Sequence, residues 1–151
     1  MSSLDGLYQE LILDHSKRPH GHGLADEEGA TATSFQKNPV CGDEVTLRVR
    51  LEGDEIRDVT WEGTGCSISQ ASASMLAALV EEEIEEGGMN RADAAKLIAG
   101  FREALRSRGK IPLDEEEFGD AAALSGVSKF SARVKCAMLA WVALEDGLTR
   151  A

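Results

Sequence analysis

Three cysteines and one aspartate are the residues of this sequence that could do chemistry together. They occur in three short segments, Cys41-Gly42-Asp43, Gly63-Thr64-Gly65-Cys66 and Val134-Lys135-Cys136. Three thiols and one carboxylate complete a ligand set for Zn²⁺, which binds both groups and is usually four-coordinate. A thiolate is also a ligand for soft metals and a sulfur nucleophile. The residue types therefore indicate either metal binding or sulfur chemistry.

The three segments are far apart in the sequence, so only a folded domain could bring them together. Cys41 lies in a short loop that also contains Asp43. Cys66 follows a Gly-Thr-Gly turn and opens a predicted helix, whose free N–H groups favour an anion such as a thiolate. Cys136 lies inside a predicted helix. Two of the three thiols thus belong to glycine-containing connections, where functional residues are common.

Simpler interpretations remain for each of these residues. A free cysteine is often a small buried hydrophobic residue, and Cys136 in its alanine-rich helix fits that description well. Asp43 could be an ordinary turn residue after Gly42. The pair His20-Gly21-His22 could bind a metal, but the adjacent proline and glycine are typical of a polar loop. The Gly-Thr-Gly turn has no P-loop lysine, so the sequence gives no support for nucleotide binding.

Length and composition predict one soluble domain covering residues 1–151. The formal net charge is −11, from 16 basic and 27 acidic residues, which argues against nucleic-acid and anionic-membrane partners. Three cysteines are an odd number, as expected for reduced thiols in the cytoplasm rather than for a secreted disulfide framework. We find no signal-peptide pattern, and the longest apolar run, residues 136–144, is too short to span a bilayer.

Hydrophobic periodicity predicts an α+β fold in which a small three-stranded antiparallel sheet packs against helices. Apolar residues recur at helical spacing over residues 3–17, 67–82 and 131–148, and Asn90 is placed to cap a further helix. Alternating patterns predict strands at 30–36, 45–51 and 56–61, with a tight turn at 52–54. Residues 109–130 contain Pro112 and an acidic stretch, and we expect them to be irregular.

The cysteine segments resemble those of the IscU-like superfamily, which includes the NifU N-terminal domains. The resemblance covers nearly the whole chain and is carried by Asn38-Pro39-Val40-Cys41-Gly42-Asp43, by Gly65-Cys66-Ser67-Ile68-Ser69 with the small residues that follow, and by Arg133-Val134-Lys135-Cys136. It implies an IscU-like (SufE/NifU-like) fold. Within the superfamily the chain is most similar to the SufU branch of zinc-dependent sulfurtransferases.

Two features separate that branch from the scaffold branch. Scaffold members resemble this chain at the cysteines but have a histidine immediately before the third one, where this chain has Lys135. The SufU type also carries an insertion before the last helix, and residues 109–130 look like that insertion. Ser131 is a small departure, because proline is more usual there, and we expect it to affect only the start of the helix.

The resemblance implies an iron–sulfur cluster assembly function with specific residue roles. It implies that Cys41, Asp43, Cys66 and Cys136 bind Zn²⁺ and that Cys41 accepts a persulfide sulfur from a pyridoxal-phosphate (PLP) cysteine desulfurase of the SufS type. A histidine of the desulfurase would replace Cys41 on zinc and free its thiolate. The sulfur would then pass to a downstream iron–sulfur scaffold.

Two other functions stay open from the sequence. The same thiolates could hold a transient iron–sulfur cluster, which would make the protein a scaffold. The site could instead be a purely structural zinc centre in a binding module, in which every ligand is equivalent.

Overall fold

The sheet is an antiparallel meander of three strands in the order β1-β2-β3. The computed structural model describes residues 3–27, 29–39 and 42–151. Strand β1 spans Ala30–Lys37, β2 spans Glu44–Glu52 and β3 spans Glu55–Thr64. A two-residue turn joins β2 to β3, so these strands pair antiparallel with Leu47 opposite Trp61. The register shifts once, at Arg50 and Leu51, where the ladder bulges.

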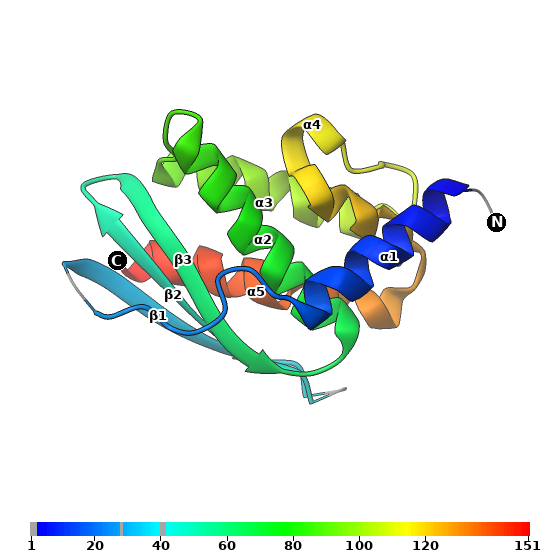
Figure 1. Ribbon diagram of the computed structural model, residues 1–151, viewed down its shortest axis with the longest axis horizontal. Helices are drawn as coiled ribbons and strands as arrows, with labels where there is room; N and C mark the ends of the chain where they lie inside the picture. The colour runs from blue at the N-terminus through cyan, green and yellow to red at the C-terminus, as the bar shows by residue number, and fades with distance from the viewer. Residues whose placement is uncertain (1–2, 28, 40–41) are drawn as a thin grey trace.

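One face of the sheet is buried against helices. Along β2 the residues alternate strictly between buried and half-buried, which is the period of two that a sheet with one covered face requires. Helix α5 (Ser131–Arg150) packs on β1 and β2, while helix α2 (Ser67–Glu85) packs on β3 (Figure 1). Helix α3 (Arg91–Arg106) packs on α5. The result is a sheet layer beneath a helical layer, with the core between them.

Small residues allow α2 and α5 to pack closely. The buried face of α2 is made largely of serine and alanine. The hydroxyl of Ser72 donates to the backbone carbonyl of Ala137 on α5 at 2.5 Å and accepts from Trp141 Nε1 at 3.0 Å. Trp141 in turn stacks on Phe101 of α3, with ring centroids 3.8 Å apart and planes 5° apart. A polar side chain on α2 is thus satisfied entirely by α5, inside the core.

Helix α1 (Ser3–Lys17) is tied to the helical layer through a buried histidine. His15 Nε2 lies 2.9 Å from the Asp120 carboxylate and Nδ1 lies 2.7 Å from the Ser74 hydroxyl. A carboxylate only accepts, so Nε2 donates the hydrogen bond to Asp120. Ser74 is fully buried and also accepts the backbone N–H of His20. The group resembles a nucleophilic triad, but its hydroxyl is closed to any substrate and fastens α1 to α2.

The segment 109–130, expected to be irregular, is instead largely helical. It contains the single turn α4 (Glu115–Phe118), capped by Asp114, and the 3₁₀ helix η1 (Gly119–Lys129). Alanine and leucine residues of η1 are buried against α1, α2, α3 and α5. Pro112 and the acidic stretch obscured this apolar run in the sequence. Its origin as an insertion stays a prediction.

The other expected elements are confirmed, and so is the α+β fold. Each predicted strand and helix is present, and its ends lie within a few residues of those that the hydrophobic pattern predicts. Asn90 caps α3 as expected, in a reciprocal capping box with Asp93. None of the described helices combines the length and the apolar character needed to cross a lipid bilayer.

The hydrogen bonds of Ser72 give the first prediction. Ser72→Ala removes the partner of a buried indole N–H, and we expect it to lower the free energy of unfolding by about 1–3 kcal/mol. Ser16→Ala is the matched control, because the Ser16 hydroxyl makes an exposed hydrogen bond to the Leu13 carbonyl within α1. We expect this control to change the free energy of unfolding by less than about 0.5 kcal/mol. Urea unfolding followed by circular dichroism measures both, and equal stabilities would contradict the role of Ser72.

Candidate metal centre

Asp43, Cys66 and Cys136 converge at one end of the sheet. One potential ligand atom from each lies within 4.8 Å of the others, and no other group of three or more such residues occurs among 3–27, 29–39 and 42–151. Asp43 immediately precedes β2, Cys66 joins β3 to α2, and Cys136 lies in the second turn of α5. Cys41, the fourth expected ligand, lies outside the described residues.

The Asp43 carboxylate is buried and held in place. It is 2% exposed, and its Oδ1 accepts the backbone N–H of Cys66 at 2.9 Å. Its backbone carbonyl accepts the N–H of Asn38 at 2.8 Å, and the Asn38 carbonyl accepts the N–H of Gly42 at 2.8 Å. Asn38, which precedes the cysteine loop, is therefore hydrogen-bonded to Gly42 and Asp43, which follow Cys41. This environment is unlike that of an ordinary solvated turn carboxylate.

Gly63 and Gly65 of the Gly-Thr-Gly segment, which lies at the end of β3, are required because other atoms of the fold approach their Cα positions closely. A Cβ on Gly65, whose φ is +154°, would lie 2.4 Å from Asp43 Oδ1 and 2.7 Å from Ser69 Oγ. A Cβ on Gly63 would lie 2.5 Å from the backbone carbonyl oxygen of Glu44. Both glycines thus make room for the strand and carboxylate that carry the site.

The separations between the donor atoms suit a tetrahedral metal. Cys66 Sγ lies 3.5 Å from Asp43 Oδ2. Bonds of about 2.3 Å to sulfur and 2.0 Å to oxygen at tetrahedral angles place these atoms about 3.5 Å apart. Cys136 is 1% exposed, whereas Cys66 is only half-buried. The donor set of two described sulfurs and one oxygen, with one side accessible, fits Zn²⁺ or iron.

Cys66 opens onto a groove of about 580 Å³ on the molecular surface. Apolar side chains line it, among them Tyr8 and Ile12 of α1, Ile68 of α2, Val127 of η1 and Phe130 before α5. Lys129 and Arg133 add two cations. Phe130 is 63% exposed, which is unusual for a large aromatic side chain. The centre is therefore reached from a surface that is mainly apolar, whereas the chain as a whole is acidic.

The comparison with known families agrees with this architecture. The family model of the NifU-like N terminal domain matches residues 7–137. The chain belongs to this family. The matched range includes all three cysteine segments, so the convergence of Asp43, Cys66 and Cys136 occurs in the part of the chain that carries the family pattern.

Two proteins similar to this chain carry different descriptions. The chain is 39% identical over 149 residues to the zinc-dependent sulfurtransferase SufU of Bacillus subtilis, covering 99% of this chain and 94% of that protein. It is also 39% identical over 150 residues to the iron–sulfur cluster assembly scaffold protein IscU of Streptococcus pyogenes, covering 99% and 87%. Identity alone therefore does not separate the two descriptions.

A solved structure shares the fold. The crystal structure of FiSufU from Fervidobacterium islandicum, described as a candidate iron–sulfur cluster assembly scaffold protein for the SUF system, matches with a TM-score of 0.73. The two chains are 34% identical, and the match covers 97% of this chain and 99% of that one.

The structure also shows where the histidines lie and gives two residues roles that the sequence did not indicate. None of the three histidines belongs to the described cluster, and His22 instead packs edge-on against Trp61. The anchoring role of Asn38 was missed, although the residue stands directly before the proline of the cysteine loop. The role of Gly65 was also missed, because a close approach across the fold leaves no sign in the local pattern.

The Gly65 contacts generate a prediction about the site. Gly65→Ala forces the Asp43 carboxylate or the helix start to move, and we expect it to lower the free energy of unfolding by about 1–3 kcal/mol. Gly6→Ala is the control, since a Cβ at Gly6 of α1 meets nothing within 4 Å. Denaturant titration of the two metal-free variants measures the difference, and an unchanged Gly65→Ala protein would refute the close-approach argument.

Proposed function

We propose that this protein is a zinc-dependent sulfurtransferase that accepts persulfide sulfur from a PLP-dependent cysteine desulfurase for iron–sulfur cluster assembly. The observation that carries the proposal is the convergence of Asp43, Cys66 and Cys136 at the loop whose sequence includes Cys41. Membership of the NifU-like N terminal domain family and the similarity to a named zinc-dependent sulfurtransferase support it.

Four residues of this chain would hold the zinc, namely Cys41, Asp43, Cys66 and Cys136. Bound zinc keeps thiols deprotonated at neutral pH and is redox-inert, so it does not itself oxidise sulfur. Three thiolates and one carboxylate would leave a formal charge of about −2 on the loaded site. Asp43 is the only hard ligand of the set, and its fixed hydrogen bond from Cys66 N–H orients it before any metal binds.

Cys41 is proposed as the sulfur acceptor. Its thiolate attacks the terminal sulfur of a cysteine persulfide on the desulfurase. A new S–S bond forms on Cys41 while the S–S bond of the donor breaks, and the donor cysteine leaves as a thiolate. No net oxidation occurs, because one persulfide replaces another. Gly42, which follows Cys41 in the sequence, has a φ of +75°, and a Cβ placed on it would meet no atom within 4 Å.

The apolar groove at Cys66 supports the involvement of a protein donor. Exposed apolar surface next to a functional centre is typical of an interaction site. Tyr8, Ile12 and Phe130 surround the accessible side of Cys66 and provide such a surface. The desulfurase would thus approach the centre over α1 and the start of α5.

A scaffold that assembles a transient iron–sulfur cluster is the second candidate. The names of the Streptococcus pyogenes relative and of FiSufU favour it, and thiolates hold iron as well as zinc. Lys135 favours sulfur transfer instead, because a protonated lysine is a poor ligand. Lys135 is exposed and lines a groove between α3 and α5. A purely structural zinc centre is the third possibility.

The acceptor role of Cys41 leads to a direct test. We expect the zinc-loaded protein to stimulate turnover of a SufS-type cysteine desulfurase, measured as alanine formed from cysteine. Cys41→Ala should keep its fold and lose nearly all of the stimulation, because no thiolate receives the sulfur. Mass spectrometry of the non-reduced parent protein should locate one extra sulfur atom on Cys41.

The outcome also separates the candidates. Full stimulation by Cys41→Ala would refute the acceptor role. A protein that unfolds when Cys41 is removed would favour the structural zinc centre. A coloured cluster formed by anaerobic reconstitution, in place of one tightly held zinc, would favour the scaffold.

Asp43 provides a separate prediction. Asp43→Ala should still bind zinc, but with lower affinity, because water fills the vacated position. We expect it to lose most of the desulfurase stimulation, since Cys41 is no longer released in the right geometry. Competition with a chromophoric chelator measures the affinity. The buried carboxylate also accepts a hydrogen bond from the Cys66 N–H. Asp43→Asn keeps an acceptor oxygen for this bond and is therefore the matched control. Unchanged affinity and activity in Asp43→Ala would remove Asp43 from the ligand set.

A further inference from the structure

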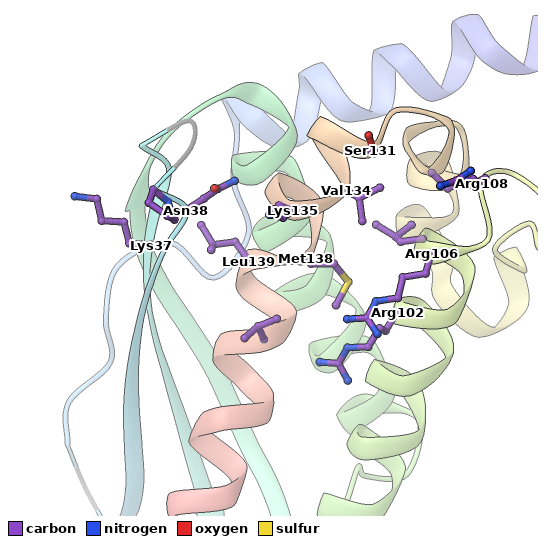
Figure 2. A pocket seen from close by; sticks show the side chains of 14 residues that line it. Lys37, Asn38, Arg102, Arg106, Arg108, Ser131, Val134, Lys135, Met138 and Leu139 are labelled. Carbon is purple, nitrogen blue, oxygen red and sulfur yellow. The ribbon is translucent and has the colours of Figure 1, made fainter.

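A second groove lies between α3 and α5, and Lys135 is among the residues that line it (Figure 2). Its volume is about 500 Å³, which is within the range of small-molecule sites. Apolar side chains of both helices line it, including Leu105, Met138 and Leu139. Ser128 and Ser131 add hydroxyl groups. A mainly apolar groove with a few polar groups at defined positions is typical of a ligand site.

The charge of this groove is opposite to that of the chain. Its 14 lining residues include five lysines and arginines and no aspartate or glutamate, although the whole chain has 27 acidic and 16 basic residues. Arg102 and Arg106 are one turn apart on α3, and Figure 2 shows both side chains on the wall that faces α5. A groove with one sign of charge concentrates the opposite ion.

Only some of these cations are available to a ligand. Arg102 donates two hydrogen bonds to the Glu145 carboxylate, at 2.9 and 2.7 Å, and these bonds hold the pKa of Glu145 below its ordinary value. Lys37 Nζ lies 3.5 Å from Glu44 Oε1, so these two side chains form an ion pair. Within the described part of the chain, no ion pair is recorded for Arg106, Arg108 or Lys135. These three exposed cations therefore remain to bind an anion.

The start of α5 adds to the attraction for an anion. Ser131 is the first residue of α5 and lines the groove, and no side chain caps this helix start. Backbone N–H groups at a helix start favour negative charge. Ser131 supplies both a backbone N–H and a hydroxyl at this position.

Asp43, Cys66 and Cys136 do not line this groove, but residues next to the candidate centre in the chain do. Asn38 lines the groove, and its N–H donates to the carbonyl of Asp43. Lys135 lines the groove and precedes Cys136. Pro39, the described residue at the start of the Cys41 loop, also lines it. A ligand held here would therefore contact Pro39 and Lys135, which lie within two residues of Cys41 and Cys136 in the sequence.

We propose that this groove binds a small thiol bearing carboxylate groups, which removes the sulfur from Cys41. The inference rests on the proposed function for its reaction, but not for its binding site. The ligand's thiolate attacks the terminal sulfur of the Cys41 persulfide, forming a new S–S bond. The S–S bond to Cys41 breaks, Cys41 leaves as a thiolate, and the ligand departs as a persulfide. Atoms and electrons balance without an added oxidant or reductant.

Binding is tested on the zinc-loaded full chain with S-methylglutathione, which has two carboxylates and cannot react. Titration followed by ¹H–¹⁵N NMR should show saturable shifts at groove residues. Arg106→Gln and, separately, Arg108→Gln should weaken binding about tenfold or more, because each removes a charge-assisted donor. Arg57→Gln, an exposed arginine outside the groove, is the matched control and should bind as the parent does. An absence of saturable binding, or shifts outside the groove, would overturn the proposal.

The reaction is tested in single turnovers of the persulfidated protein. Glutathione is compared with neutral 2-mercaptoethanol and cationic cysteamine as the attacking thiol. Arg106→Gln should slow sulfur release to glutathione about tenfold and leave the 2-mercaptoethanol rate unchanged. Equal slowing with all three thiols, or no slowing with glutathione, would overturn the proposal.

The binding and single-turnover experiments together also distinguish the inference from the proposed function. If Cys41 never carries a persulfide while S-methylglutathione binds the groove, the sulfurtransferase function fails and the anion site stands. If the persulfide forms on Cys41 and S-methylglutathione does not bind, the function stands and the inference fails.

Discussion

The close packing of α2 on α5 is the constraint on which the rest of the site depends. Cys66 precedes the first residue of α2 and Cys136 lies near the start of α5, so their sulfurs meet only if the two helix axes approach closely. The serine and alanine face of α2 permits this approach, and Ser72 fixes it by bonding both a carbonyl and the indole of α5. A larger side chain on that face would separate the two thiols.

The sheet contributes the third donor through a different interaction. Asp43 stands directly before β2, and its carboxylate reaches across to the Cys66 N–H, which lies just beyond the neighbouring strand. Glycines at positions 63 and 65 leave the space for this contact. A buried carboxylate is costly unless it is hydrogen-bonded or bound to a metal. Here the backbone supplies part of that compensation, and a metal would supply the rest.

The two grooves near the centre differ in how many cations line them. Both are mainly apolar and neither has an acidic lining residue, but the groove at Cys66 has only Lys129 and Arg133, whereas the groove beside Lys135 has five lysines and arginines. Sulfur transfer requires both a donor and a recipient. Both grooves offer apolar surface to a partner, and the larger number of cations beside Lys135 would favour an anionic recipient there.

The sequence by itself determined the α+β class, nearly all of the elements and the identity of the four candidate ligands. Periodicity and turn residues are local, and the cysteine segments are specific enough to indicate the family. It did not reveal that 109–130 is largely helical, because acidic residues and Pro112 mask a short apolar run whose helix is stabilised by packing on four other helices. Only the tertiary structure showed that Asp43, Cys66 and Cys136 converge, that Asn38 anchors their loop, and that the basic residues of α3 face Lys135 across a groove. These are contacts between segments far apart in the chain, and they depend on how the helices pack rather than on any local preference.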